Sequence, residues 1–308
     1  LITRDEIISY AALDAMVGQV AAALLAQGLA PGDRIATWLP KTRLACIMPL
    51  AAARAGLVHV PVNPMLKHAQ VAHILADSGA RLLVTASSRQ TALAEADVPE
   101  ACRIVLDAEL EDHAAKLTPL PASNADVNAL VAILYTSGST GRPKGVMLSH
   151  ANLWLGAMSV AHYLGISAED RVLAVLPLSF DYGQNQLFST WAAGGAVIPL
   201  DYLTARDVVK AVERHDVTTI AGVPPLWTQL CEVDWPAEIA ARLRRLTNSG
   251  GALTVPLVDR LTSLFPNAAL YPMYGLTEAF RSTYLAPEFV ATHPTSMGRA
   301  IPFAEIMV

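Results

Sequence analysis

Ala129-Leu-Val-Ala-Ile-Leu-Tyr135 is followed without a break by Thr136-Ser-Gly-Ser-Thr-Gly-Arg-Pro-Lys144. The first segment has the length and apolar character of a buried strand. The second segment is rich in glycines and hydroxyl side chains and ends in a lysine. Glycines let the backbone turn tightly and point successive N–H groups at an anion, to which hydroxyls and a lysine add further donors. Together the two segments predict a strand that ends in a phosphate-binding loop.

Strand-like and helix-like segments alternate on both sides of this loop. Before it they occupy residues 10–25, 32–39, 44–55, 58–62, 71–78 and 81–85. After it the alternation resumes and continues from residue 171 to residue 271. Strands that alternate with helices indicate parallel sheets covered by helices. We therefore predict an α/β fold of two tandem α/β subdomains with mostly parallel sheets, at about residues 1–150 and 151–295.

The composition argues against a nucleic-acid-binding or membrane-spanning protein. The 308 residues are 53% hydrophobic and 16% charged, and the formal net charge is −5. A nucleic-acid-binding domain would show a basic balance or a basic stripe, which the sequence lacks. The longest apolar run, residues 44–53, is shorter than the roughly 20 residues that a membrane span needs. Cys46, Cys102 and Cys231 are widely spaced, which predicts free thiols in a reducing cytoplasm.

The Walker A loop of P-loop NTPases is the obvious alternative for the glycine-rich segment. That pattern requires a glycine before the lysine and a serine or threonine after it. Here Pro143 precedes Lys144, and Gly145 follows it. A solvated linker between a strand and a helix is the other alternative. The buried strand before the loop and the segment Gly145–His150 after it favour a phosphate site of a different kind.

Four segments together resemble the AMP-forming adenylating superfamily, which includes acyl- and aryl-CoA ligases, luciferases and amino-acid-adenylating domains. Tyr135–Val146 is similar to its phosphate-loop signature, and Tyr274-Gly-Leu-Thr-Glu278 to its Y-G-x-T-E motif. Ser249-Gly-Gly-Ala-Leu253 resembles its adenine-lining segment, and Gly298-Arg-Ala-Ile-Pro302 resembles its entry into a distorted β-barrel. The order and spacing of the four segments match over essentially the whole chain.

The resemblance implies that ATP and Mg²⁺ are used to convert a carboxylate into an acyl-adenylate with release of pyrophosphate. It assigns the ATP phosphates to Thr136, Ser137, Gly138, Ser139, Thr140, Gly141 and Lys144. It assigns adenine and AMP binding to Gly250, Gly251, Ala252, Tyr274, Gly275, Leu276 and Thr277. It gives Glu278, with Thr136, a catalytic or metal-binding role. The metal and the donors would stabilise the negative charge that grows during attack on the α-phosphate.

The position of the motifs also predicts a pocket for the acid substrate. Its expected residues are Phe180, Asp181, Asn185, Gly222, Asn248, Met273 and Arg281. Phe180-Asp181 resembles the F-D of amino-acid-adenylating domains, where the carboxylate pairs with the substrate ammonium group; the alternative is that Asp181 caps the following helix. Arg281 is either a fork-shaped donor for an acidic group of the substrate or a surface arginine.

The resemblance implies an AMP-forming acyl-CoA ligase, with coenzyme A as the acceptor. The alternatives are an amino-acid-adenylating domain that loads the phosphopantetheine of an acyl carrier protein and, thirdly, an inactive nucleotide-binding relative. The intact Thr140, Lys144 and Glu278 argue against the third. The run Ala279–Leu285 resembles acyl-CoA-ligase-like proteins encoded beside exopolysaccharide and exosortase genes. The sequence leaves open which acid is activated and whether the protein forms oligomers.

The resemblance also makes the chain a partial N-terminal adenylate-forming domain, residues 1–308. Residues 296–308 would begin the barrel subdomain, and the C-terminal lid domain would be absent. Because closing such a lid orders the reactants and excludes water, we expect this piece alone to be inactive or nearly so.

Overall fold

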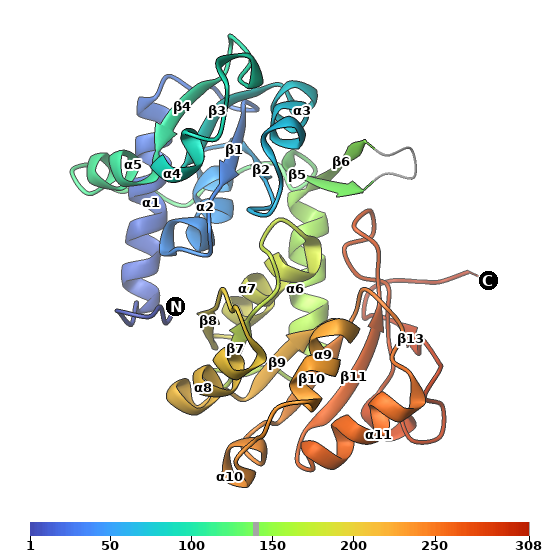
Figure 1. The fold of residues 1–308 in the computed structure, drawn as a ribbon. Helices are drawn as coiled ribbons and strands as arrows, with labels where there is room; N and C mark the ends of the chain where they lie inside the picture. The colour runs from blue at the N-terminus through green and yellow to red at the C-terminus, as the bar shows by residue number, and fades with distance from the viewer. Residues whose placement is uncertain (138–141, 308) are drawn as a thin grey trace. The chain divides into compact units, whose positions relative to one another are not determined.

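The computed structural model describes residues 1–137 and 142–307 and divides the chain into two compact units (Figure 1). The first unit comprises Leu1, Thr3–Asn152 and Pro177–Asp181. The second comprises Ile2, Leu153–Leu176 and the chain from Tyr182 onward. Each unit is built on its own sheet, as the predicted α/β fold with tandem subdomains requires, so that prediction is confirmed.

The first unit contains a six-stranded sheet in the order β4-β3-β1-β2-β5-β6. Its strands are β1 (Arg34–Trp38), β2 (Val58–Pro61), β3 (Ala80–Thr85), β4 (Arg103–Leu106), β5 (Leu130–Ser137) and β6 (Pro143–Ser149). All neighbouring pairs are parallel except β5 and β6, which are antiparallel. β1, β2 and β3 are almost wholly buried, as in sheets covered on both faces.

Helices of the first unit begin where the sequence supplies capping groups. They are α1 (Tyr10–Ala26), α2 (Arg43–Arg54), α3 (His68–Ser78), α4 (Ser87–Gln90), α5 (Asp107–Ala114) and the short η1 (Glu95–Asp97). The hydroxyls of Ser9 and Thr42 accept the first free N–H groups of α1 and α2. Gly79, with φ +60°, ends α3 in the left-handed conformation that favours glycine. α1 contacts α2 and α5, and α3 contacts β3 and β6.

The second unit contains a seven-stranded sheet in the order β13-β12-β11-β10-β9-β7-β8. Its strands are β7 (Arg171–Ala174), β8 (Ala196–Pro199), β9 (Thr219–Gly222), β10 (Arg245–Asn248), β11 (Ala269–Tyr274), β12 (Thr283–Tyr284) and β13 (Arg299–Ala300). The strands from β8 to β11 are parallel, whereas β12 and β13 are antiparallel additions at one edge.

Helices of the second half of the chain alternate with these strands. They are α6 (His150–Leu164), α7 (Asp181–Ala192), α8 (Ala205–His215), α9 (Pro224–Cys231), α10 (Ala237–Ala240), α11 (Val255–Leu264) and the short η2 (Pro287–Phe289). α9 and α11 carry proline in their first turn, where the missing N–H costs no helical hydrogen bond. Trp227, Phe265 and Leu230 are fully buried in the main core of this unit.

The structure places several elements differently from the sequence-based expectations. The expected strand 129–135 is β5, but the chain continues from the glycine-rich loop into strand β6 rather than directly into a helix. The expected start of the helix at residues 71–78 was wrong by about one turn, since α3 begins at His68. β4, α5, β12 and β13 were not predicted. Among the described residues, no helix is both long enough and apolar enough to cross a membrane.

Candidate functional site

The two ends of the glycine-rich segment lie on β5 and β6, an antiparallel pair that we call the hairpin stem. Thr136 pairs with Lys144, and Ser137 pairs with Pro143, across the two antiparallel strands. Residues directly opposite each other share a face of the sheet, with Cβ atoms about 5 Å apart. The Thr136 hydroxyl and the exposed Lys144 are therefore neighbours on one face of the hairpin stem.

The centre of the predicted phosphate loop lies outside the described residues. This applies to Gly138, Ser139, Thr140 and Gly141, and also to the side chain of Ser137. The structure thus positions the two ends of the loop, Thr136 and Lys144, and the roles of the residues between them stay predictions.

Helix α3 holds both strands of the hairpin stem. The Tyr135 hydroxyl, at the end of the apolar part of β5, donates a 2.6 Å hydrogen bond to Asp77. His73 Nε2 donates a 3.0 Å hydrogen bond to the carbonyl oxygen of Pro143 at the start of β6. His73 and Asp77 are four residues apart, so they lie on the same face of α3. Burial, and then the neighbouring Asp77 carboxylate, raise the pKa of Tyr135, which keeps this phenol protonated as a donor.

Gly145 is required by close packing within the hairpin. A Cβ atom at this position would lie 2.6 Å from Cγ2 of Ile133 and 3.1 Å from Cζ of Tyr135. Any side chain would therefore displace Tyr135, whose hydroxyl anchors the stem to α3. The glycine that rules out a Walker A loop after Lys144 is thus explained by the packing of the stem.

An open groove of about 460 Å³, measured for the centres of water-sized spheres, lies at the carboxyl ends of β10 and β11 in the second unit. Ligands bind outside the carboxyl ends of strands in open α/β sheets. The lining consists of Asn248, Gly250, Gly251, Ala252, Leu253, Pro272, Met273, Tyr274, Gly275 and residues 294–297. Gly250 has φ +77°, which a residue with a side chain adopts only with strain. The groove therefore has a flat backbone floor and one half-exposed aromatic ring, Tyr274.

The turn after β11 is held by unusual packing. Phe280 is fully buried although its φ is +58°, a conformation that is strained for a bulky residue. A Cβ atom on Gly156 of α6 would lie 2.1 Å from the Phe280 ring, so the glycine makes room for it. Arg281 packs against Gly275 in the same way, with its Nη1 3.3 Å from the position of a Cβ atom. These contacts place Glu278 at the surface and Arg281 in the interior.

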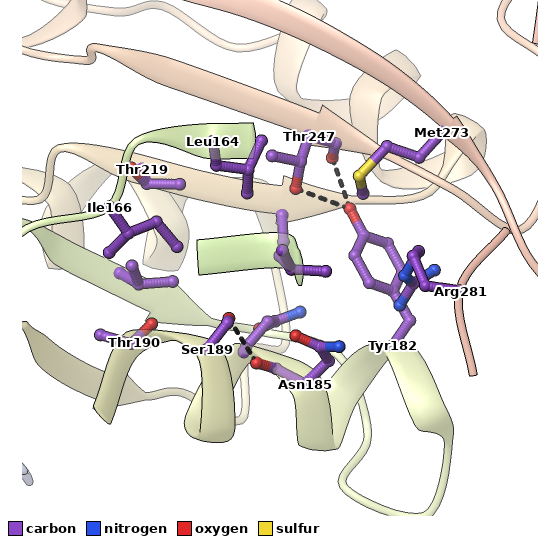
Figure 2. A pocket seen from close by; sticks show the side chains of 14 residues that line it. Leu164, Ile166, Tyr182, Asn185, Ser189, Thr190, Thr219, Thr247, Met273 and Arg281 are labelled. Atoms are coloured by element: carbon purple, nitrogen blue, oxygen red, sulfur yellow. Dashed lines mark hydrogen bonds between the residues drawn. The ribbon is translucent and has the colours of Figure 1, made fainter. Parts of the chain in front are cut away.

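A second, smaller cavity lies between α6, α7 and the sheet of the second unit (Figure 2). Its volume is about 20 Å³ for the centres of water-sized spheres. Leu164 and Ile166 form an apolar wall, while Asn185, Ser189 and Thr190 of α7 form a polar wall. The lining residues are Val160, Leu164, Ile166, Val172, Tyr182, Asn185, Gln186, Ser189, Thr190, Thr219, Ala221, Thr247, Met273 and Arg281.

Arg281 and Tyr182 close one end of this cavity. The Arg281 guanidinium lies 4.8 Å from the centre of the Tyr182 ring, and its Nη1 donates a 3.3 Å hydrogen bond to the Ser249 hydroxyl. The Tyr182 hydroxyl lies 2.7 Å from both Oγ1 and the carbonyl oxygen of Thr247. Arg281 is only 3% exposed, so the alternative of a surface arginine is wrong.

Met273 lines both the groove and the small cavity. The Tyr163 hydroxyl lies 2.8 Å from its sulfur and fixes the position of the side chain. A ligand in the groove and a ligand in the cavity would therefore meet at Met273. A nucleotide joined to a small acyl group needs two adjacent sites of these unequal sizes.

The model of the AMP-binding enzyme family matches residues 1–308. The chain belongs to the AMP-binding enzyme family. A feruloyl-CoA synthase of Amycolatopsis sp is 32% identical over 274 residues, which are 88% of this chain and 55% of that protein. The chain therefore spans about half the length of this curated relative.

Two solved structures of similar proteins agree with this membership. VinN in complex with L-aspartate is 28% identical, with a TM-score of 0.87 over 97% of this chain and 77% of that chain. ATP-bound MatB from Rhodopseudomonas palustris is 27% identical, with a TM-score of 0.86 over 97% of this chain and 61% of that chain.

The predicted nucleotide residues of this AMP-binding enzyme are only partly brought together. Gly250, Gly251, Ala252, Tyr274 and Gly275 line the groove. Leu276 is 41% exposed and Thr277 is 8% exposed, and neither belongs to the lining. Across residues 1–137 and 142–307, no three His, Cys, Asp or Glu side chains gather to hold a metal ion. One exposed carboxylate such as Glu278 fits Mg²⁺, because this ion is bound by one or two carboxylates together with substrate phosphates.

The predicted acid pocket is also partly assembled. Asn185, Met273 and Arg281 line the small cavity, and Asn248 lines the groove. Gly222 belongs to neither lining; a Cβ atom there would lie 2.6 Å from the Trp227 ring, which gives this glycine a packing role. Phe180 and Asp181 cluster with the first unit.

Sequence reasoning missed six polar lining residues: Tyr182, Gln186, Ser189, Thr190, Thr219 and Thr247. The helical spacing of polar residues at 182, 185, 186, 189 and 190 was a signal that could have found most of them, since such positions share one face of a helix.

Proposed function

We propose that the protein containing this chain is an AMP-forming acyl-CoA ligase. A carboxylate oxygen of the substrate attacks the α-phosphorus of ATP, and pyrophosphate leaves with the electrons of the broken P–O bond. A coenzyme A thiolate then attacks the acyl carbon, and AMP leaves. The observation that carries the proposal is the meeting of a nucleotide-sized groove and a small cavity at Met273 in a member of the AMP-binding family.

The described residues supply three parts of this chemistry. Lys144, beside Thr136 on the hairpin stem, brings positive charge to the triphosphate. Tyr274 and the Gly250-Gly251 backbone hold the adenine and ribose in the groove. Glu278 would hold Mg²⁺ together with the phosphates, and the bound metal would draw charge from them. The acyl group of the substrate occupies the small cavity.

An amino-acid-adenylating enzyme that loads a carrier protein is the alternative. Phe180-Asp181 favours it, and so does the similarity to VinN, which was solved with L-aspartate. Asp181 is the first residue of α7, where a carboxylate also interacts favourably with the helix dipole. In both functions ATP is consumed at the same site, and the protein is expected in the cytoplasm with free thiols.

Pyrophosphate exchange tests the shared first step. The full-length protein is incubated with ATP, labelled pyrophosphate and a panel of carboxylic acids and amino acids, and label entering ATP is counted. We expect Lys144→Ala to lower kcat/KM for exchange by about 100- to 1000-fold. Arg142→Ala, which removes the exposed cation two residues away, is the matched control and is expected to change it less than about threefold. Equal effects of the two variants would contradict the role of Lys144.

Two further measurements separate the alternatives. Acyl-CoA formation by the full-length protein favours the ligase, whereas transfer only to a phosphopantetheinylated carrier protein favours the second function. Asp181→Asn should abolish a preference for amino acids over matched acids if the carboxylate binds an ammonium group. The 308-residue chain alone is expected to turn over little, because it spans 55% of the feruloyl-CoA synthase that it resembles.

A further inference from the structure

We propose that the activated acid is small and carries at least one hydrogen-bonding group besides its reacting carboxylate. This group would be a hydroxyl, an amine, an amide or a second carboxyl, and the polar wall of the small cavity would recognise it. The inference rests on the proposed function and narrows it, because it excludes acids that have only alkyl or aryl carbon beyond the carboxylate.

Four side chains of the cavity are buried without hydrogen-bond partners. They are Asn185, Gln186, Thr190 and Thr219, and their exposed fractions are between 0% and 4%. Within the described part of the chain, the side-chain nitrogen and oxygen of Asn185 and Gln186 have no hydrogen-bond partner, and neither do the hydroxyl oxygens of Thr190 and Thr219. More than about 90% of buried polar groups in proteins are hydrogen-bonded, and one left unpaired costs about 1–3 kcal/mol. Four of them around one cavity indicate a site made for a polar ligand.

The four side chains come from two elements that face the same space. Asn185, Gln186 and Thr190 follow one another along α7, and Thr219 begins β9 (Figure 2). Their neighbour Ser189 differs, because its hydroxyl donates a 2.6 Å hydrogen bond to the Asn185 carbonyl oxygen. The unpartnered set therefore offers both amide donors and acceptors as well as hydroxyls, which suits a hydroxyl, amine or carboxyl group equally.

The rest of the lining limits the size and shape of the acid. Leu164 and Ile166 form an apolar wall opposite α7, and Val160 also lines the cavity, so a carbon skeleton suits that side of the ligand. A volume of about 20 Å³ for the centres of water-sized spheres is close to the space of one or two water molecules. A long fatty acyl chain would need the walls to move far apart, and it would leave all four polar side chains without partners.

Arg281 sets the electrostatic character of the cavity. Its guanidinium carries the one charge of the described lining, which contains no Asp or Glu. A positive charge in this place favours ligand groups with a negative or partly negative oxygen. An acid with a hydroxyl or a second carboxyl is therefore expected to bind better than an acid of the same size whose additional group is an amine.

Pyrophosphate exchange with a polar and an apolar set of acids tests this inference on the full-length protein. The polar set is lactate, 3-hydroxybutyrate, alanine, malonate and succinate; the apolar set is butyrate, isobutyrate, benzoate and octanoate. We expect kcat/KM for the best polar acid to exceed that for every apolar acid by at least about tenfold. We expect Thr190→Val and Thr219→Val each to lower this polar-to-apolar ratio by roughly 3- to 10-fold, as the loss of one hydrogen bond does.

Thr283→Val is the matched control for these variants. Thr283 is also a buried threonine, 7% exposed, and its hydroxyl also has no partner among the described residues, but it lines neither the cavity nor the groove. Its substitution should leave the ratio unchanged. Affinities for non-hydrolysable acyl-sulfamoyl-adenosine analogues with polar or apolar acyl groups, measured by calorimetry, give the same comparison without turnover.

The outcomes separate this inference from the proposed function. Exchange that is fastest with butyrate, benzoate or octanoate would overturn the inference while the ligase function stands. Cavity variants that change the ratio no more than Thr283→Val does would also overturn it and would indicate that the polar wall binds only water. Absence of exchange with every acid, by folded protein that binds ATP, would overturn both.

Discussion

Two groups of buried polar side chains in the second unit use their hydrogen-bonding capacity in opposite ways. Asp170 is completely buried, and it accepts hydrogen bonds from the Ser167 N–H at 2.9 Å, the Thr218 hydroxyl at 2.9 Å and Arg245 Nη1 at 2.6 Å. Four side chains of the small cavity are almost as deeply buried, yet their amide and hydroxyl groups have no partners within the described residues; they are Asn185, Gln186, Thr190 and Thr219.

Only the first of these two groups stabilises the fold. The Asp170 cluster ties the turn before β7 to the starts of β9 and β10, so its bonds hold the sheet together. The unpartnered side chains of the cavity connect no elements of the sheet, so their hydrogen-bond donors and acceptors are available to a ligand. Thr218 and Thr219 show the contrast most closely, because they are adjacent in sequence and point to opposite faces of the sheet.

Removal of the Asp170 carboxylate should have the largest effect on stability. Asp170→Ala leaves the largely buried Arg245 guanidinium without its ion-pair partner, and we expect a loss of about 3–5 kcal/mol in the free energy of unfolding. Urea denaturation measures this loss. Asp216→Ala breaks an exposed pair with Arg242 and is the matched control, expected to cost at most about 1 kcal/mol. Similar losses in the two variants would remove the distinction between the buried cluster and the surface.

The same carboxylate predicts a dependence on pH. Burial raises the pKa of Asp170, but the hydrogen bonds from Ser167 and Thr218 and the charge of Arg245 outweigh it and hold the pKa below 3.8. A lowered folded-state pKa contributes stability above the unfolded-state pKa, and this stability is lost as the pH falls through the folded-state value. The free energy of unfolding, measured by denaturation between pH 6 and pH 2, should therefore fall more steeply with pH below about pH 4. In Asp170→Ala this decrease below pH 4 should be smaller.

Thr218→Val tests the same cluster through a change of one atom at nearly constant volume. The substitution removes the donor to Asp170 and the acceptor of the Arg171 N–H at 3.0 Å. Both groups would stay buried without these bonds, so we expect a loss of about 1–3 kcal/mol in the free energy of unfolding. Chemical denaturation would measure it, and an unchanged midpoint would show that water replaces the hydroxyl.

The hairpin stem of the first unit resembles the Asp170 cluster, because its polar side chains are hydrogen-bonded within the protein although they flank a predicted binding loop. Tyr135→Phe removes the hydrogen bond to Asp77 and should cost about 0.5–1.5 kcal/mol of stability. Because the stem positions Thr136 and Lys144, we also expect KM for ATP to rise several-fold while kcat changes less. Tyr202→Phe, an aromatic substitution in the other unit, is the control. An unchanged KM for ATP in Tyr135→Phe would separate the stem from nucleotide binding.

Sequence reasoning found the parts of the fold and the site that depend on local pattern. The apolar run before Thr136 predicted β5, and the motifs at 249–253 and 274–278 predicted part of the lining of the groove, namely residues 250–253 and 274–275. It did not find β6, because this strand begins with Pro143, Lys144 and Gly145, which are typical of a loop and were assigned to the phosphate-binding segment. It also left Arg281 undecided, because burial of an arginine depends on Tyr182 and Ser249, which come from distant parts of the chain.

Thr219→Val should have the smallest effect on stability and the opposite sign to its neighbour. The Thr219 hydroxyl is buried without a partner, so it loses its hydrogen bonds to water and gains none in the protein. Valine has almost the same volume and no hydroxyl, and its β-branched side chain suits strand β9. We expect the free energy of unfolding to rise by up to about 1 kcal/mol without ligand, whereas Thr218→Val lowers it. With a saturating polar acid and AMP the gain should shrink or reverse, because only the wild-type hydroxyl bonds the ligand. Thermal unfolding of both variants with and without ligands measures the difference. A loss of stability in ligand-free Thr219→Val would show that this hydroxyl serves the fold as Thr218 does, and the contrast between the two threonines would disappear.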